Sequence, residues 1–139
     1  MSVEAALYKI LSTDNAVTAL VGTSSPRIYP LGIPAGKGVP AVVYQEIAGV
    51  RPTSCGGTMG YCDALFQLAF WDDEIDGART LSDAVRNALD DYSGTPAGSG
   101  TEILQVRVAN EGDMFNFNED SEALDRCGKR LDVDISYVD

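Results

Sequence analysis

The sequence predicts an α+β domain with a mainly antiparallel, four-stranded sheet and helices packed on one face of that sheet. The helical and strand patterns follow one another in the order α–β–β–α–β–β. The longest helical pattern has a continuous apolar stripe, whereas the strand patterns alternate or are rich in β-branched and aromatic residues. At 139 residues the chain is long enough to bury one core, so we expect residues 1–139 to form a single domain.

The first two predicted elements are short helices. Residues 3–11 and residues 15–21 both place apolar side chains at helical spacing. Ser12 or Thr13 is suited to cap the second piece, and Gly22 is suited to end it. We therefore expect either a helical hairpin or one broken helix at this end of the sheet.

The next stretch leads from an irregular segment into the first two strands. Residues 22–40 contain four prolines and should run extended over the surface. Residues 41–47 predict a strand, residues 48–60 a loop, and residues 61–71 a second strand. Three large apolar residues of the second strand fall on one face, which predicts that this face is buried: Phe66, Leu68 and Phe70.

Residues 72–94 give the clearest helical pattern. Asp73 is suited to cap the amino end, and Gly94 is suited to follow the carboxyl end. The polar residues fall on the opposite side from the apolar stripe, which predicts a helix lying across the sheet. The stripe consists of Ile75, Ala78, Leu81, Val85, Ala88 or Leu89, and Tyr92.

Two alternating segments predict the last two strands, residues 102–109 and residues 130–138. Residues 110–129 between them indicate a long acidic connection. In the last strand Asp132 and Asp134 fall on the outward, solvated face. The inward positions are Leu104, Val106 and Val108 in one strand, and Leu131, Val133, Ile135 and Tyr137 in the other.

The net charge of the chain limits the classes of ligand that it is expected to bind. Ten Lys and Arg residues stand against 21 Asp and Glu residues, for a formal net charge of −11. This charge opposes binding to phosphate backbones and to anionic lipid surfaces, so neither nucleic acid nor a membrane is expected as a ligand. DNA remains acceptable as a neighbour that the protein surrounds without holding. No apolar run spans a bilayer and no secretory signal is recognisable, so we expect folding in a cytosol.

The sequence contains no recognisable motif for a cofactor, a metal or catalysis. The segment around Lys37 lacks the glycine spacing, the hydroxyl residue and the following helix of a phosphate-binding loop. Cys55, Cys62 and Cys127 have no metal-site spacing and are expected to be reduced thiols. The chain contains no His, so a nucleophile would lack its usual base. We therefore expect no cofactor and no enzymatic activity.

Several segments, taken in order, resemble the tail completion proteins of tailed bacteriophages, which are also called tail terminators. The amino-terminal match is "ALYKILSTDNAVTALVG", followed by "RIYP" and "VPAVVYQEIAG". The central match is "FQLAFW" followed by "ARTLSDAVRNALDDYSG", and the last is "EGDMF" with the closing strand "LDVDISYV". Each piece alone is an ordinary helix or strand pattern, whereas the ordered set covers nearly the whole chain.

The resemblance implies a structural virion protein without catalytic residues. Proteins of this family form a ring, typically a hexamer, at the head-proximal end of the tail tube, where they stop polymerisation and make the joint to the head. The implied partners are copies of the chain itself, the major tail tube protein, and a head-completion or connector protein. The implied location is the tail or neck of a phage or prophage virion assembled in the bacterial cytoplasm. In such a ring DNA passes through without specific binding, and we expect Asp132 and Asp134 to belong to the acidic surface that faces it.

Two other readings remain open from the sequence. One is a different neck or minor tail component, such as a head-closure protein, which would have a similar acidic chain and another partner. The other is a small bacterial enzyme or ligand-binding domain, which would have a formed polar pocket.

Overall fold

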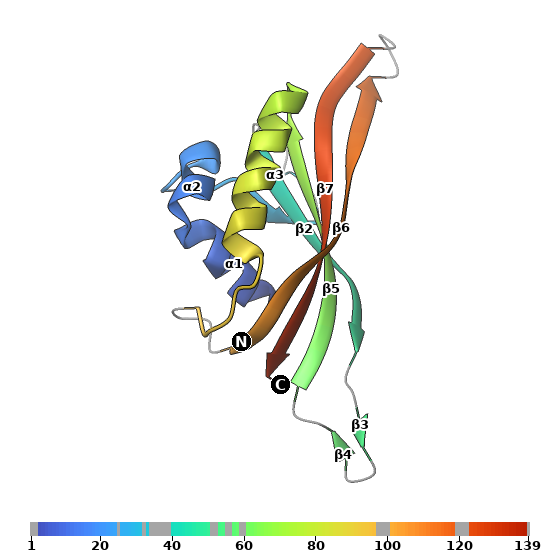
Figure 1. Ribbon diagram of the computed structural model, residues 1–139. Coiled ribbons are helices and arrows are strands. Elements are labelled where there is room, and N and C mark those ends of the chain that lie inside the picture. The colour runs from blue at the N-terminus through green and yellow to red at the C-terminus, as the bar shows by residue number, and fades with distance from the viewer. Residues whose placement is uncertain are drawn as a thin grey trace.

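The protein is described here by a computed structural model (Figure 1). It describes residues 3–24, 26–31, 33, 40–50, 53–54, 57–58, 61–96, 101–118 and 123–138. Three helices cover one side of a twisted sheet, and two hairpins project from opposite ends of that sheet (Figure 1).

The main sheet has five strands in the order β1-β2-β5-β7-β6. All neighbouring pairs are antiparallel except β1 and β2, which are parallel. The strands are β1 (Ile28–Pro30), β2 (Ala41–Val50), β5 (Tyr61–Asp72), β6 (Ile103–Asn118) and β7 (Ala123–Val138), and a separate hairpin is formed by β3 (Thr53–Ser54) and β4 (Gly57–Thr58). The predicted number of four strands was therefore wrong. Proline-rich surroundings hid β1, whose place at the edge of the sheet tolerates its own proline.

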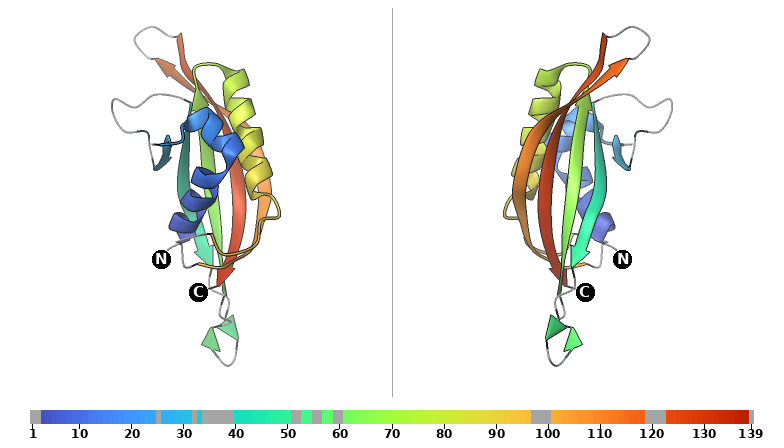
Figure 2. Two further views of the ribbon diagram at one scale, coloured as in Figure 1. Left: turned by 90° about the vertical axis from the view of Figure 1, so that its left-hand side faces the viewer. Right: turned by 90° about the vertical axis from the view of Figure 1, so that its right-hand side faces the viewer.

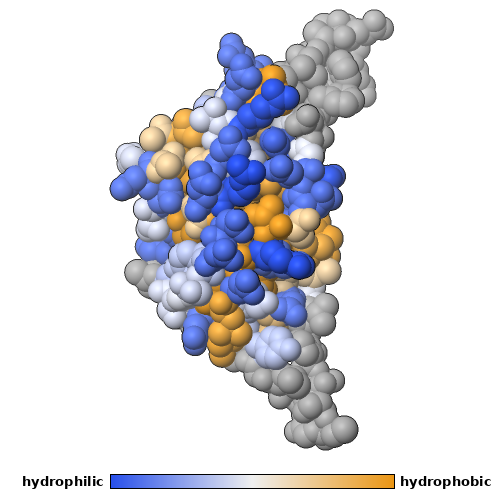
Figure 3. Space-filling view, in the orientation of Figure 1, coloured by the Kyte–Doolittle hydropathy of each residue, from blue (hydrophilic) through white to orange (hydrophobic). Residues whose placement is uncertain are grey.

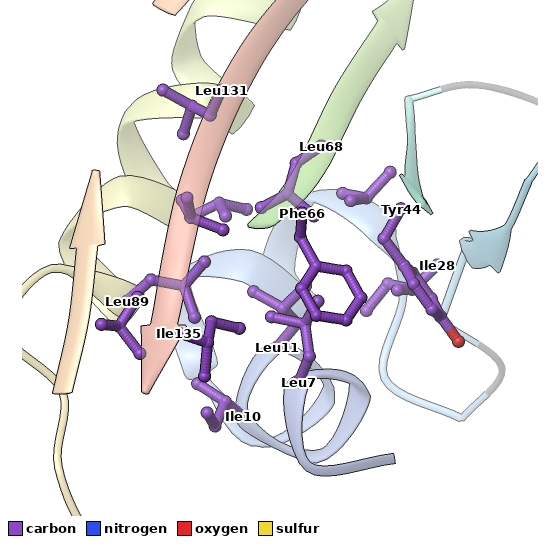
Figure 4. Close-up of a cluster of buried hydrophobic side chains, with 14 of the residues drawn as sticks. Leu7, Ile10, Leu11, Ile28, Tyr44, Phe66, Leu68, Leu89, Leu131 and Ile135 are labelled. Atoms are coloured by element: carbon purple, nitrogen blue, oxygen red, sulfur yellow. The ribbon is translucent and has the colours of Figure 1, made fainter. Parts of the chain in front are cut away.

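The helices α1 (Val3–Thr13), α2 (Asn15–Val21) and α3 (Ile75–Leu89) lie on one face of the sheet, as predicted (Figure 2). One core cluster fills the space between the two layers. Side chains of α1 meet those of the central strands there, with Leu7 and Leu11 near Phe66 (Figure 4). The prediction that the even-numbered face of residues 61–71 is buried is confirmed, since Phe66, Leu68 and Phe70 are each 0% exposed.

The first two helices are separated by the single residue Asp14. Its Oδ1 accepts hydrogen bonds from the backbone N–H groups of Ala16 at 3.0 Å and Val17 at 3.1 Å. This side chain, and not that of Ser12 or Thr13, caps α2, because both of those residues lie inside α1. Gly22 ends α2 with a φ of 107°, as the sequence predicted.

Helix α3 is shorter than the pattern indicated. It begins after Glu74 instead of Asp73 and ends at Leu89, with Asp90 as the carboxyl-terminal cap. Its polar residues face outward over the surface (Figure 3). Gly94, expected next to the helix end, instead forms a bridge with Ile103, through hydrogen bonds of 2.9 and 2.8 Å. Its φ of 131° favours glycine at this position.

Residues 110–129 do not form the long connection that we expected. β6 continues to Asn118 and β7 begins at Ala123, so both strands form one long hairpin. The pairing with β5 ends at Cys127, and the rest of the hairpin extends beyond the sheet (Figure 1). Register shifts in β6 interrupt the two-residue alternation, which is why the sequence pattern failed there.

The predicted loop at residues 48–60 also contains strand structure. β2 runs three residues farther than expected, to Val50, and β3 and β4 pair with each other beyond it. At the start of β6 a register shift between Ile103 and Gln105 reverses the predicted orientation of Leu104. Leu104 is exposed, and Ile103 takes its place in the core.

Candidate functional site

The face of the sheet opposite the helices, which we call the open face, carries the predicted site residues (Figure 2, right). Asp134 of β7 is paired with Leu65 of β5 and Arg107 of β6. Asp132 lies two residues away, between Gln67 and Asn110. Their neighbours Leu131, Val133 and Ile135 point into the core, so the predicted alternation of the last strand is confirmed.

Each of these aspartates lies beside an arginine. The Arg107 Nη2 donates a hydrogen bond to Asp134 Oδ2 at 2.8 Å. On the same face the Ser136 hydroxyl donates to Asp63 Oδ1 at 2.5 Å. These four side chains and Gln105 line an open pocket of about 330 Å³. The pocket is polar, with Arg107 and Asp134 paired to each other and Asp63 accepting a hydrogen bond from Ser136.

Arg130 completes the row of charges. Its Nε lies 3.8 Å from Asp132 Oδ1, and its guanidinium lies over Gly112 of β6, where an added Cβ would be 3.3 Å from Nη2. That Nε is buried and makes no hydrogen bond. The side chains on this face whose positions the structure describes include three carboxylates and two guanidinium groups, which together carry a net charge of −1. The two arginines therefore make the net charge of this face less negative than its three aspartates alone would make it.

A second cluster of ionisable side chains, formed by Glu4, Tyr44 and Glu46, lies on the helix side of β2. Burial raises the pKa of Glu46 above its ordinary value, and a hydrogen bond to the Glu4 carboxyl group and its charge add to the effect. The pKa of Tyr44 is also raised, mainly because the side chain is buried and to a smaller extent because of the nearby charges of Glu4 and Tyr8. The sequence did not reveal this group, because it depends on how α1 crosses β2. It borders a groove of about 420 Å³ lined by Glu4, Pro30, Leu31, Tyr44, Gln45 and Glu46.

The remaining residues singled out from the sequence are the three cysteines and Lys37. Cys62 is a buried free thiol, and Cys127 pairs in register with Asp72 at the end of the sheet. Cys55 and Lys37 lie outside the described residues. Across the described part of the chain, no three His, Cys, Asp or Glu side chains gather as metal ligands would. Within the same part, none of the helices is long and apolar enough to cross a membrane.

Residues 5–119 match the model of the family described as "Tail completion protein gp17". The chain belongs to this family. A protein chain in the structure entitled "Virion of native gene transfer agent (GTA) particle" has a similar fold, with a TM-score of 0.62 and 18% identity over 99% of this chain and 93% of that chain. No curated protein matches the chain. Membership of the tail completion family identifies a structural tail protein of a phage-type particle.

Proposed function

We propose that this tail completion protein closes the head-proximal end of a tail tube as a homo-oligomeric ring, most simply a hexamer. In that position it stops tube polymerisation and joins the tail to the head. Its partners are then the major tail tube protein on one side and a head-completion or connector protein on the other. The observation that carries the proposal is the match of residues 5–119 to the tail completion family.

The open face lines the channel in this proposal, with Asp132 and Asp134 toward the DNA. Binding of DNA gains free energy when cationic side chains release the counterions of the phosphates. On the open face both described arginines lie beside aspartates, at 2.8 Å and 3.8 Å. A surface with paired charges and a small net negative charge offers DNA no strong contact. It therefore supports a conduit through which DNA passes without being held.

The net charge opposes closure of the ring. Six copies of a chain with a net charge of −11 carry six times that charge. Like charges within a Debye length, about 8 Å at physiological salt, repel each other and raise the free energy of the closed ring. We therefore expect the isolated protein to be mostly monomeric at low ionic strength. The ring forms as salt rises or when the end of a tube supplies a template.

Native mass measurements across a salt series, with and without purified tail tubes, test this function. We expect monomers at low salt, rings at higher salt, and rings at low salt only when tubes are present. A stable ring at low salt without tubes would contradict the charge argument. Tight binding of duplex DNA by the free protein would contradict the conduit.

A further inference from the structure

The outer edge of β2 is covered by another strand over only part of its length. β1 pairs with residues 42–44 of β2, and a hydrogen bond of 2.9 Å from the Leu31 N–H to the Tyr44 carbonyl oxygen follows. Beyond that bond the described residues place no strand on the outer side of residues 45–50. Residues 45–49 are exposed. Strand edges of this kind can pair with an extended segment of another chain.

Leu31 turns the chain away from this edge. Its φ of 68° lies in the left-handed region, which is unfavourable for a bulky side chain such as leucine. An extended strand does not continue through that conformation, so β1 ends beside Tyr44. The Leu31 side chain is also 76% exposed. Backbone strain of this kind is concentrated at binding and catalytic sites, so the end of β1 is a candidate for one of them.

A groove of about 420 Å³ lies where β1 stops. The end of β1, with Pro30 and Leu31, forms one part of its lining. Glu4 of α1 and Glu46 of β2 line it as well. The ring of Tyr44, a further lining residue, belongs to the core cluster, and its hydroxyl group points away from that cluster (Figure 4). The groove therefore combines apolar side chains with two carboxyl groups, next to the unpaired part of β2.

The two carboxyl groups of the groove have no cationic partner within the described part of the chain. Glu46 is hydrogen-bonded to Glu4, and none of the ion pairs between described residues involves either glutamate. A Cβ added to Gly49 would lie 2.8 Å from Glu46 Oε1, so this carboxyl group lies along the unpaired part of β2. Two carboxylates held close together repel each other, and a cation beside them offsets that repulsion.

The charges of the chain favour a cation from a different protein. Copies of this chain carry a net charge of −11 each and repel one another. The arginine side chains that the structure describes also have partners within their own chain already. Four of them lie beside carboxylates and one donates to two backbone carbonyl oxygens: Arg79, Arg86, Arg107 and Arg130, and Arg27.

We propose that the groove and residues 45–49 of β2 bind an extended segment of a different protein, with a Lys or Arg side chain of that segment beside Glu4 and Glu46. The segment continues the line of β1 along β2, and its apolar side chains cover Leu31 and Ile47, which is 50% exposed. Main-chain hydrogen bonds to β2 supply affinity, and the carboxyl groups select a basic over an acidic segment. The site lies within one copy of the chain, so it does not depend on the proposed ring.

A synthetic peptide tests the site. The probe is a short capped peptide of alternating valine and lysine, and its matched counterpart carries glutamate in place of lysine. Both are titrated into the protein, with the NMR shifts of the backbone amides as the readout. We expect the lysine peptide to shift residues 45–49 most, and the glutamate peptide to bind at least about tenfold more weakly. Equal affinities, or shifts confined to other residues, would overturn the proposal.

Glu46→Lys reverses one charge of the groove and should lower the affinity for the lysine peptide at least about tenfold. Asp76→Lys is the matched control, because it makes the same charge change at a side chain that is 91% exposed in the first turn of α3. It should lower the affinity less than about twofold, since salt screens distant exposed charges. Equal losses in the two variants would show attraction by net charge alone and contradict the site.

Leu31→Asn is a second probe, because asparagine tolerates the left-handed conformation and lacks the apolar side chain. It should also weaken binding of the lysine peptide, and an unchanged affinity would remove Leu31 from the site and contradict the proposal. Urea unfolding shows that each variant is folded.

Two further outcomes would assign the groove to another occupant and overturn the proposal. A lysine peptide that binds the Lys37→Ala variant but not the wild type would show that the chain fills the groove with its own residues. Self-association of the wild type under the conditions of the titration, lost in Glu46→Lys and kept in Asp76→Lys, would show that a second copy occupies it. Native mass measurements on the same samples detect that association.

Discussion

The indole ring of Trp71 lies over Gly128, its partner in the pairing of β5 with β7. A Cβ added to Gly128 would lie 2.9 Å from two carbon atoms of that ring and 3.3 Å from the carbonyl oxygen of Phe70. Contacts of 2.9 Å do not occur for real Cβ atoms, so only glycine lets the ring occupy this position. Trp71 is the single tryptophan of the chain and therefore reports on this contact.

Gly128→Ala should displace the Trp71 ring and destabilise the fold. The added methyl group overpacks the strand pair, which costs about 1–3 kcal/mol of the free energy of unfolding. Urea unfolding measures the loss, and the emission maximum of tryptophan should shift to longer wavelength as the ring becomes more exposed. Gly112→Ala is the control, because its Cβ would meet the movable guanidinium of Arg130 at 3.3 Å. Equal losses in the two variants would show that the ring contact is not decisive.

Asp14→Ala should destabilise the amino-terminal helices. It removes the acceptor for the N–H groups of Ala16 and Val17, which costs about 0.5–2 kcal/mol. Asp14→Asn keeps a side-chain oxygen and should lose much less. Thermal unfolding followed by circular dichroism compares the three proteins. An asparagine variant as unstable as the alanine variant would mean that the carboxylate charge, and not the cap, supplies the stability.

Leu68→Ala should leave a cavity in the middle of the core. The Leu68 side chain is completely buried between the sheet and the helices, and such truncations cost about 2–5 kcal/mol. Leu104→Ala removes the same atoms from a side chain in solvent and should change the free energy of unfolding by less than about 0.5 kcal/mol. Similar losses for the two variants in urea unfolding would contradict the assignment of Leu104 to the surface.

Glu46→Gln should make the monomer more stable at neutral pH. The raised pKa of Glu46 means that the folded state binds more protons than the unfolded state between the ordinary and the raised value. Stability from this group therefore falls as pH rises through that window, and glutamine removes the fall. Because the carboxyl group is exposed and screened by solvent, the gain at pH 7 stays below about 1 kcal/mol.

Urea unfolding at several pH values, at a concentration where the protein is monomeric, measures this difference. The advantage of the glutamine variant should disappear below the ordinary pKa of a glutamate, about 4.3. A variant that is less stable than the wild type at pH 7 would show that the Glu4 and Glu46 carboxyl groups stabilise each other.

The sequence predicted the elements whose periodicity is set by one buried face. The helices on one side and the buried face of β5 with Phe66, Leu68 and Phe70 are confirmed. The sequence prediction failed where one extra residue in a strand, a β-bulge, shifts the two-residue alternation of its side chains. The bulge at Leu104 exchanged two neighbouring side chains, and further register shifts hid the second half of β6. β1 was missed because a three-residue edge strand has too few residues to show any pattern.

The sequence predicted the outward position of Asp132 and Asp134 on the last strand but not the ion pairs that they form. Alternation placed Asp132 and Asp134 on the outward face of the last strand, and the structure puts them on the open face. The arginine partner of Asp134 was beyond prediction, because Arg107 reaches it only through the pairing of β6 with β7, 27 residues apart in the chain. The Glu4 and Glu46 contact likewise depends on a tertiary crossing and left no local signal.

β7 also determines how the molecule responds to pulling. From Cys127 to Val138 it is hydrogen-bonded to β5 on one side and to β6 on the other. A force along this strand loads both ladders in shear, so many hydrogen bonds resist together instead of opening one after another. β7 has 16 residues. At a rise of about 3.3 Å per residue it is roughly 53 Å long, and it extends beyond the layer of helices. A load applied at the tip of the long hairpin is therefore transmitted through the centre of the sheet.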